Sequence, residues 1–548
     1  MEKPWLEHWP KNVPQSINYP NFSLGEMLKT STRDATNSTC LFFRGIELTY
    51  ERLDDLVGRF GRALQNMGIR KGDRIALYLP NMPQFVIAYY GAVRIGAVIV
   101  ACSPLYKDRE LSHILYDSGA RILVFLDELA QYVQLAKEKT RLEHVIIARF
   151  EDFDEAQSKI EARHRVEENP NTHYFLDLIT ESTLPELPSI DPEKDIALLQ
   201  YTGGTTGTPK GAMLTHRNLV VNAVQFATWL YMRRRMEVHL SVLPFFHIYG
   251  MTAAMNAPIY TSSIMVLISN PRDTNSILES IDKYKPTIFC GVPTSYITLI
   301  NHPELRSHKI RSIRTCISGA APLPQEVQRR FEELTGGRLV EGYGLTEASP
   351  VTHVNPLDNP NKNRPGSIGI PISDTECKIV NVESGENTSP LEPGELVIKG
   401  PQVMKGYWNM PNETSLVLRG GWLFTGDIAV MDADGYFRII DRKKDMINVS
   451  GFKVYPREVE EVLYQHPAIK EAAAAAFPDP DSGEVVTAYV VLNDAFKARI
   501  SPSDIIEFCK ERLANYKVPR TVKFMELLPK SPAGKTLRRD LKNQNQSI

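Results

Sequence analysis

Short hydrophobic runs rich in Val and Ile alternate with helix-like stretches along most of the chain. Examples are "RIALYLP" (74–80), "RILVFLD" (121–127), "PTIFCGVP" (286–293) and "RTCISGAAPL" (314–323). Runs of this length and composition are typical of buried strands. Strands that alternate with helices indicate α/β layers with largely parallel sheets, so the pattern predicts an α/β fold.

Two segments need a choice between helix and strand. The most apolar window, residues 85–102, is interrupted by Arg94 and two glycines, so we predict a buried helix followed by a strand rather than a membrane span. The alanine run at 472–476 favours a helix by propensity. Pro478 and Pro480 follow at once and would stop a helix, so we predict that this run begins a strand.

The pattern changes twice toward the C-terminus. Short, glycine-punctuated strands from residue 385 to 441 predict a small β-rich subdomain, and a new α/β pattern runs from about residue 452 to the end. Between them, "DRKKD" (441–445) is a run of five charged residues, where we place a domain boundary. Composition alone does not distinguish this boundary from an ordinary surface loop. The predicted domains are residues 1–440 and 446–548.

Composition narrows the class of protein. A chain of 548 residues is too long for one ordinary core. The 63 basic and 65 acidic residues nearly cancel, which gives no footprint of nucleic-acid binding. Six scattered cysteines without a CxxC pair fit a reducing compartment, and the N-terminus has no signal-peptide pattern. The C-terminal "NQSI" is not a peroxisomal signal. We therefore expect a soluble, cytoplasmic enzyme.

The stretch "YTGGTTGTPKGAMLTH" (201–216) combines glycines, hydroxyls and one lysine. It is not a Walker A motif, because Lys210 follows Pro209 and precedes Gly211, and because strand-like runs flank it on both sides. A strand–loop–strand hairpin can wrap a polyphosphate with backbone N–H groups and hydroxyls. The alternative is an exposed hairpin turn, and the residue types favour phosphate binding.

This stretch resembles the signature of the adenylate-forming superfamily, which includes acyl-CoA synthetases, luciferases and adenylation domains of peptide synthetases. Four more motifs follow in the family's order: "EGYGLTE" (341–347), "GWLFTGD" (421–427), "DRKKDMINVSGFKVYP" (441–456) and "PKSPAGKTLRRDL" (529–541). The resemblance spans nearly the whole chain. It implies a large N-terminal domain of layered α/β sheets and a small, mobile α+β C-terminal domain that rotates between two half-reactions. A carboxylate is first activated as acyl-AMP with loss of pyrophosphate, and the acyl group is then transferred to a thiol.

The resemblance also implies which residues bind ATP and Mg²⁺. Glu347 would hold Mg²⁺ with help from Thr202, Tyr343 would lie against adenine, and Asp427 would accept hydrogen bonds from the ribose, with the charge of Arg442 nearby. Without the family, Glu347 could cap a helix and "SGAAPL" (318–323) could be a tight turn. The implied ATP-binding set is Thr202, Gly203, Gly204, Thr205, Thr206, Gly207, Lys210, Gly319, Ala320, Ala321, Glu341, Gly342, Tyr343, Gly344, Thr346, Asp427, Arg442 and Lys535.

By the same resemblance, the catalytic lysine is Lys535, which would reach the carboxylate and the α-phosphate during adenylation. Lys210 would be an anchor on the outer phosphates or on its own loop. Lys444 would be the hinge within 441–445, and Gly451 and Phe452 would line the channel for coenzyme A. Taken alone, Lys535 could equally be an exposed lysine of a basic tail.

The segment "LPFFHIYGMT" (243–252) resembles the family's acyl pocket and contains no acid. A buried ammonium needs a charged partner, so an amino-acid substrate is disfavoured. The implied pocket is mostly small or apolar and favours a medium- to long-chain fatty acid. His247 would also orient the carboxylate, although a core histidine is the equal alternative. The pocket set is Phe246, His247, Val292, Gly319, Gly344, Leu345 and Ala348.

We therefore predict an acyl-CoA ligase with ATP and coenzyme A as co-substrates and Mg²⁺ as cofactor, closest to bacterial long-chain fatty-acid–CoA ligases. Aryl or short-chain acids, a luciferase-like oxygenase and a non-catalytic sensor stay open as alternatives. So do a homodimer and peripheral contact with a membrane. Candidate cations for the coenzyme A phosphates are Arg233, Arg234, Arg235, Lys443, Arg520 and Lys523.

Overall fold

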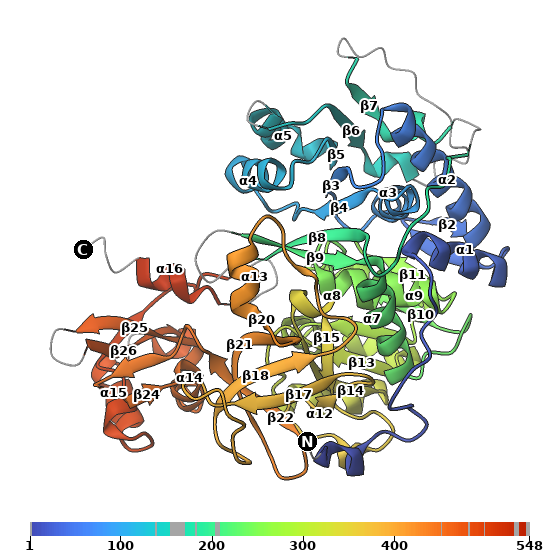
Figure 1. The fold of residues 1–548 in the computed structure, drawn as a ribbon. Coiled ribbons are helices and arrows are strands. Elements are labelled where there is room, and N and C mark those ends of the chain that lie inside the picture. The colour runs from blue at the N-terminus through green and yellow to red at the C-terminus, as the bar shows by residue number, and fades with distance from the viewer. Residues whose placement is uncertain are drawn as a thin grey trace. The chain divides into compact units, whose positions relative to one another are not determined.

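The computed structural model describes residues 3–137, 140–153, 170–180, 184–202, 209–450, 452–479, 483–497, 499–530 and 536–543. The chain forms two compact units (Figure 1). The large unit comprises residues 5–376 and 399–423, and the small unit comprises residues 1–4, 377–398 and 424–548.

One sheet of the large unit has the strand order β19-β9-β8-β4-β3-β5-β6-β7. Helices α4 (Asp108–Ser118) and α5 (Ala130–Lys137) cover one face, and α2 (Tyr50–Asn66) and α3 (Pro83–Arg94) lie on the other (Figure 1). The strands are β3 (Arg74–Tyr78), β4 (Val98–Ala101), β5 (Ile122–Leu126), β6 (His144–Ala148), β7 (Thr172–Tyr174), β8 (Ile196–Thr202), β9 (Lys210–Thr215) and β19 (Gly406–Tyr407).

The other sheet of the large unit has the order β16-β15-β14-β13-β12-β10-β11-β1-β2. Its central strands, from β14 to β11, are parallel. The strands are β1 (Thr39–Phe43), β2 (Ile46–Thr49), β10 (Val238–Ser241), β11 (Ile264–Leu267), β12 (Ile288–Gly291), β13 (Thr315–Ser318), β14 (Arg338–Gly344), β15 (Val351–Val354) and β16 (Ile370–Pro371). The remaining helices of this unit are α1 (Leu24–Asp34), α6 (Phe175–Leu178), α7 (His216–Trp229), α8 (Ile248–Met251), α9 (Ala257–Tyr260), α10 (Thr274–Tyr284), α11 (Pro293–Ile300), α12 (Gln325–Thr335) and α13 (Pro411–Val417).

A further sheet has the order β17-β18-β21-β20, with β22 paired to β21, and a last one has the order β24-β23-β26-β25, with β27 paired to β26. The helices of the small unit are α14 (Pro456–Leu463), α15 (Pro502–Lys510) and α16 (Arg538–Asn543). The strands of these two sheets are β17 (Glu376–Val380), β18 (Gly394–Lys399), β20 (Leu418–Arg419), β21 (Trp422–Met431), β22 (Phe437–Arg442), β23 (Ile447–Val449), β24 (Phe452–Val454), β25 (Ile469–Asp479), β26 (Gly483–Leu492) and β27 (Thr521–Phe524).

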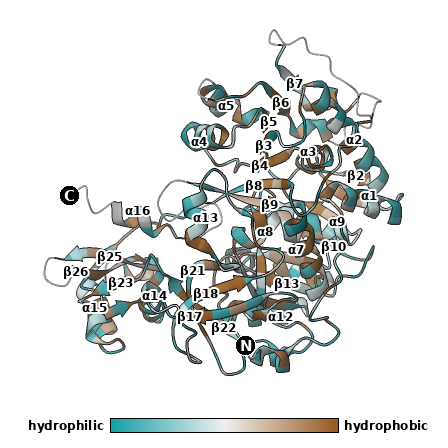
Figure 2. Ribbon diagram, viewed as in Figure 1, coloured by the Kyte–Doolittle hydropathy of each residue, from teal (hydrophilic) through white to brown (hydrophobic). Residues whose placement is uncertain are grey.

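The hydrophobic runs form the cores of these sheets (Figure 2). The predicted α/β fold class is confirmed. Residues 85–102 form α3 and then β4, and the alanine run lies within β25, both as predicted. Alanine enters a strand here because β26 pairs with its whole length and because α14 packs on it, so tertiary contacts override helix propensity. All six cysteines are buried and none forms a disulfide.

Candidate active site

The predicted ATP and acyl residues of the large unit lie at the ends of neighbouring strands. Strands β10, β12, β13 and β14 are parallel neighbours, and Ser318 at the end of β13 pairs with Glu341 of β14. Phe246 and His247 follow β10, Val292 follows β12, and Gly319 follows β13. Carboxyl ends of parallel strands meet at one edge of a sheet, which is where ligands bind in open α/β sheets.

A buried tyrosine, Tyr249, connects the acyl segment with the end of β13. The Tyr249 hydroxyl donates to the carbonyl oxygen of Ile317 at 3.0 Å. Its ring lies so close to Gly319 that a β-carbon there would be 3.0 Å from the ring. The acyl segment 243–252 therefore packs directly against the predicted adenine wall, and glycine at 319 is what leaves room for the ring.

The predicted adenine wall is tied together by Glu341. Its buried carboxylate accepts a hydrogen bond from the Leu323 backbone N–H at 3.1 Å, which closes the turn of residues 318–323 onto β14. Tyr343 stands edge-on to His353, with ring centroids 5.9 Å apart. Burial lowers the pKa of His353 to about 3, so that this supporting ring is neutral.

The stretch 201–216 belongs to the predicted hairpin, which β8 and β9 form. Thr202 ends β8 and pairs with Lys210, the first residue of β9. The predicted phosphate-binding residues Gly203, Gly204, Thr205, Thr206 and Gly207 lie outside the described residues. The structure therefore describes where this stretch begins and ends, and its role in phosphate binding stays a prediction.

Tyr407 contacts both Lys210 and Glu347. The Lys210 ammonium pairs with the Glu413 carboxylate of α13 and lies 5.4 Å from the centroid of the Tyr407 ring. The Tyr407 hydroxyl donates to Glu347 Oε1 at 2.7 Å. Glu347 itself lies in a single helical turn, Thr346–Ala348, that directly follows Leu345. The residues predicted from two separate motifs, Lys210 and Glu347, are thus brought together by a tyrosine that no motif indicated.

Glu347 and Thr202 supply a carboxylate and a hydroxyl, which are hard oxygen ligands. In the described part of the chain, no three His, Cys, Asp or Glu side chains gather as they would in an all-protein metal site. Mg²⁺ is commonly held by one or two carboxylates together with water and substrate phosphates. The two residues therefore fit Mg²⁺ bound with a nucleotide.

In the acyl segment, His247 begins α8, and its Nδ1 accepts a hydrogen bond from the Tyr249 backbone N–H at 3.2 Å. Burial lowers its pKa, which favours the neutral imidazole. The Phe246 carbonyl accepts from Gln200 Nε2 at 3.1 Å, so β8 also supports this segment. Ala348 is fully buried, and at Gly344 a β-carbon would clash with the Pro350 carbonyl at 2.2 Å.

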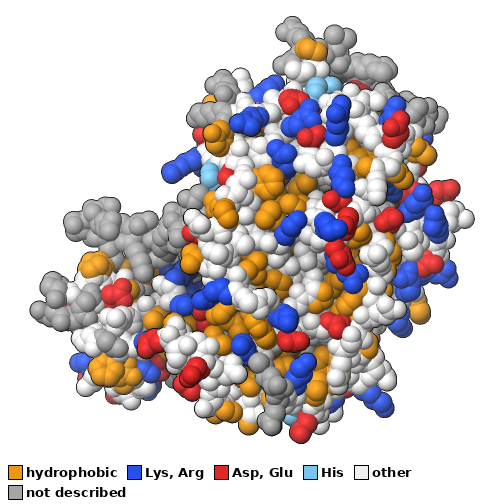
Figure 3. All heavy atoms as spheres, viewed as in Figure 1, with side chains coloured by type: hydrophobic (Ala, Val, Ile, Leu, Met, Phe, Trp, Pro, Cys, Tyr) orange, Lys and Arg blue, Asp and Glu red, His pale blue; other side chains and the backbone are white. Residues whose placement is uncertain are grey.

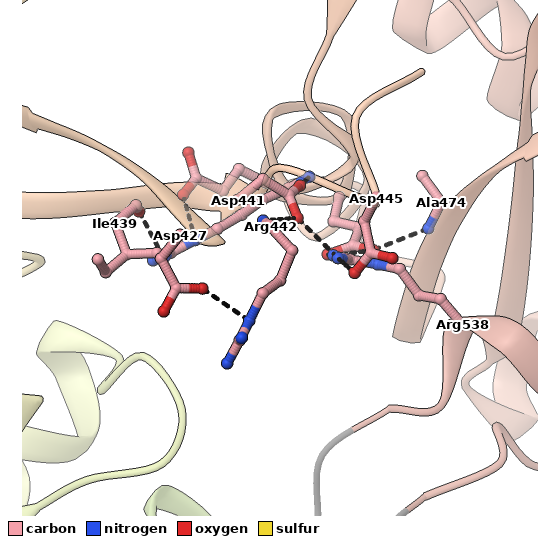
Figure 4. Close-up of polar contacts among 10 residues, drawn as sticks. Asp427, Ile439, Asp441, Arg442, Asp445, Ala474 and Arg538 are labelled. Carbon is pink, nitrogen blue, oxygen red and sulfur yellow. Dashed lines mark hydrogen bonds and ion pairs between the residues drawn. The ribbon is translucent and has the colours of Figure 1, made fainter. Parts of the chain in front are cut away.

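The other predicted residues belong to the small unit. Asp427 and Arg442 are cross-strand partners on β21 and β22, with Arg442 Nε 2.6 Å from Asp427 Oδ1 (Figure 4). Lys444 is exposed, and Phe452 stacks on Tyr516 with ring centroids 4.9 Å apart. Gly451 and Lys535 lie outside the described residues.

Most candidate cations for the coenzyme A phosphates have acidic partners. Arg233 pairs with the buried Glu237, and Arg234 pairs with Asp34. Lys443 pairs with Glu395, and Arg520 lies 3.4 Å from Asp479. On the face that Figure 3 shows, Lys and Arg are interspersed with Asp and Glu, without a broad patch of one sign. These contacts favour structural roles for Arg233 and Arg234.

Comparison with known proteins shows the family to which the chain belongs. Residues 28–408 match the AMP-binding enzyme family, and residues 458–535 match the AMP-binding enzyme C-terminal domain. The chain belongs to the AMP-binding enzyme family. The family predicted from the motifs is thereby confirmed.

Individual AMP-binding enzymes are similar over nearly the whole chain. A long-chain-fatty-acid–CoA ligase of Bacillus subtilis is 44% identical over 553 residues, covering 98% of both chains. The crystal structure of the anthranilate CoA ligase AuaEII in complex with anthranoyl-AMP has a TM-score of 0.83 at 28% identity, covering 96% of this chain and 98% of that one. ATP-bound MatB from Rhodopseudomonas palustris has a TM-score of 0.85 at 27% identity, covering 96% and 100%.

Proposed function

We propose that this AMP-binding enzyme is an ATP-dependent acyl-CoA ligase that acts on medium- to long-chain fatty acids. In the first half-reaction, a carboxylate oxygen bonds to the α-phosphorus of ATP and pyrophosphate leaves. In the second, the sulfur of coenzyme A bonds to the acyl carbon and AMP leaves. The observation that carries the proposal is the resemblance to the Bacillus subtilis ligase over the full length of both chains.

Adenylation brings anions together, so catalysis depends on positioning and on neutralising charge. Glu347 and Thr202 would hold Mg²⁺, which would offset phosphate charge. The motif assigns phosphate binding to residues 203–207, and Lys210 would act as an anchor at the start of β9. Lys535 contacts the carboxylate and α-phosphate, and Asp427 binds the ribose. The motif positions support these roles, and the contacts of Glu347 and Lys210 support the roles of those two residues.

The acyl segment supports a fatty acid over an amino acid. Residues 245–249 are Phe, Phe, His, Ile and Tyr, and burial favours neutral His247. A substrate ammonium would therefore find no carboxylate in this segment, whereas an alkyl chain would meet apolar side chains. An aryl acid is the second candidate, because the structurally similar AuaEII binds anthranoyl-AMP.

We also propose that the hinge lies at 441–445, with Lys444 as the hinge residue, and that Phe452 lines the coenzyme A channel. A cytoplasmic location is supported by the six buried, unpaired cysteines. No helix of the described residues is long and apolar enough to cross a membrane.

The test is pyrophosphate release with ATP and Mg²⁺, with and without coenzyme A. The acids are acetate, octanoate, palmitate and benzoate. We expect release with octanoate or palmitate and the matching acyl-CoA when coenzyme A is present. If only benzoate supports pyrophosphate release, the substrate is an aryl acid and not a fatty acid. If no acid supports release, the ligase proposal is refuted.

A further inference from the structure

A cavity of the large unit lies at the opposite edge of the sheet from the predicted ATP and acyl residues. Arg314 directly precedes β13 and Arg338 begins β14, so both lie at the amino ends of these parallel strands. Gly319 of the predicted adenine wall follows β13 at its carboxyl end. The five residues of chain from Arg314 to Gly319 span about 16 Å when extended, so the two places are separate.

The cavity has the size of a small-molecule site. Its volume is about 380 Å³, and pockets for small molecules typically have about 300–1,000 Å³. The residues on which its chemistry depends are Lys11, Asn12, Tyr231, Arg314, Arg338 and Asp358.

Cations outnumber carboxylates in the lining. Of the described residues that line the cavity, Lys11, Arg314 and Arg338 are cations and Asp358 is the carboxylate. Lys11 and Arg338 are exposed, and neither forms an ion pair with the residues that the structure describes. Asp358 accepts from the Lys11 backbone N–H at 2.9 Å and lies 3.2 Å from Lys362 Nζ, so its charge is already compensated.

Arg314 shares its acidic partner with a second arginine. Its Nη2 lies 2.6 Å from Oε1 of the buried Glu237, and Arg233 Nε lies 2.9 Å from the same oxygen. Its Nη1 donates to Thr315 Oγ1 at 3.0 Å. A guanidinium carries five N–H donors, so Arg314 keeps donors for an anion, and one carboxylate does not neutralise two guanidinium groups.

One further acid acts on this cluster from α12. Glu332 lies close enough to Arg338 for their charges to interact, and its Oε1 accepts from the Leu339 backbone N–H at 2.9 Å. With the partners named above, the cluster has five cations and three carboxylates. The chain as a whole has a formal charge of -2, so the positive charge here is a local property of this cavity.

The rim of the cavity is held in an uncommon backbone conformation. Asn12 and Tyr231 have φ angles of 65° and 51°, in the left-handed region that a bulky side chain rarely adopts. The Tyr231 hydroxyl donates to the Lys11 carbonyl, which fixes the two rim segments to each other. Strained backbone of this kind gathers at ligand-binding sites.

We propose that this cavity binds the phosphate groups of a small phosphorylated molecule. Lys11, Arg314 and Arg338 donate charge-assisted hydrogen bonds to the phosphate oxygens. None of these three residues belongs to the predicted ATP or acyl sets, so the proposal does not depend on the proposed ligase function.

The test is hydrogen–deuterium exchange followed by mass spectrometry, with inorganic pyrophosphate as the probe. We expect pyrophosphate to slow amide exchange in peptides that contain Lys11, Tyr231 or Arg338. The concentration that gives half-maximal protection is then the affinity of this cavity alone, because the predicted phosphate-binding stretch 203–207 lies in a different peptide. Sodium chloride at the same ionic strength controls for screening and should give no such protection.

Arg338→Gln and Lys11→Gln remove exposed cations, whereas a change at Arg314 would take a partner from the buried Glu237. We expect each single variant to raise the half-maximal concentration about 10-fold, the loss that follows from one charge-assisted hydrogen bond. The double variant should lose the protection. Arg311→Gln is the matched control, because Arg311 is an exposed arginine of the same unit outside the cavity, and it should leave the affinity unchanged.

If pyrophosphate does not slow exchange in these peptides, or if sodium chloride slows it equally, the site is overturned. Protection that persists in the double variant would overturn it as well, because the anion would then bind elsewhere. None of these results bears on the ligase, which is tested by acid-dependent release of pyrophosphate.

Discussion

At the scale of single residues, the orientation of Glu347 depends on Tyr407, sixty positions away in the chain. A carboxylate that must accept a metal ion needs at least one oxygen directed toward it. The Tyr407 hydroxyl donates to Oε1, and the Met404 backbone N–H donates to the Glu347 carbonyl at 2.8 Å. Both contacts come from the segment around β19, which therefore acts as a support for the predicted metal ligand.

We predict that Tyr407→Phe weakens adenylation. A hydrogen bond to a charged group contributes about 1.5–3 kcal/mol, and part of that should appear as an approximately 10-fold lower exchange rate and a higher Mg²⁺ requirement. The measurement is the pyrophosphate exchange rate across a Mg²⁺ titration. Tyr464→Phe is the control, because that hydroxyl donates to the Ala472 carbonyl of the small unit. An unchanged Mg²⁺ dependence in Tyr407→Phe would contradict the supporting role.

At the scale of elements, the hairpin β8–β9 is secured by a short helix from elsewhere in the chain. Lys210 at the start of β9 pairs with Glu413 of α13, and β19, just before α13, pairs with β9. Lys210 is nearly buried, so its ammonium is costly to leave without a partner. These contacts support the anchor role for Lys210 rather than a catalytic one.

A double-mutant cycle tests this role. We expect Lys210→Gln and Glu413→Gln each to lower the exchange rate about 10-fold, and the double variant to lose little more than either one. Residues that act through one shared contact are non-additive. If Lys210→Gln greatly lowers the exchange rate while Glu413→Gln leaves it unchanged, Lys210 instead acts on the phosphates directly.

Contacts between elements also mark the limit of what the sequence predicts. The strand ends, the hairpin and the motif residues can be predicted from the sequence, because glycine spacing and hydrophobic runs are local signals. The roles of Tyr407 and Gln200 cannot be predicted in this way, because their partners lie far away in the chain and no spacing encodes them. Tyr249 lay inside a quoted motif, but its packing against Gly319 is visible only once β10 and β13 are placed in one sheet.

At the scale of the whole molecule, the predicted machinery is divided between the two units. Glu347, Lys210 and the acyl segment belong to the large unit, whereas Asp427 and Lys444 belong to the small one. Matches to two family domains, 28–408 and 458–535, follow a similar division. We therefore expect that one half-reaction can be lost without the other.

We predict that Lys535→Ala nearly abolishes acyl-AMP formation from free acid yet leaves thioester formation from supplied acyl-AMP largely intact. The reason is that Lys535 neutralises charge only while the carboxylate meets the α-phosphate. Each half-reaction is measured separately, with Lys542→Ala as a control in the same C-terminal segment. An equal loss of rate in both half-reactions would contradict this role of Lys535.

The whole molecule should also lose stability in mild acid. Burial lowers the pKa of His239 to about 3, while an unfolded histidine titrates near 6.5. The stabilisation is complete above about pH 6.5 and is lost as the pH falls, because the unfolded state then binds more protons. We expect His239→Gln to flatten the decline in the free energy of unfolding between pH 6.5 and 4, measured by denaturant titration, and His302→Gln to leave it unchanged. Parallel curves for wild type and His239→Gln would contradict this.

The six buried cysteines have a consequence for an enzyme whose co-substrate is itself a thiol. Burial raises the pKa of Cys509 to about 11 and those of Cys102 and Cys290 to about 12, so that almost no thiolate forms at neutral pH. Exchange with a disulfide requires an accessible thiolate. Oxidised coenzyme A would therefore find no cysteine to modify in the folded protein, and the ligase would keep its activity as the thiol pool becomes oxidised.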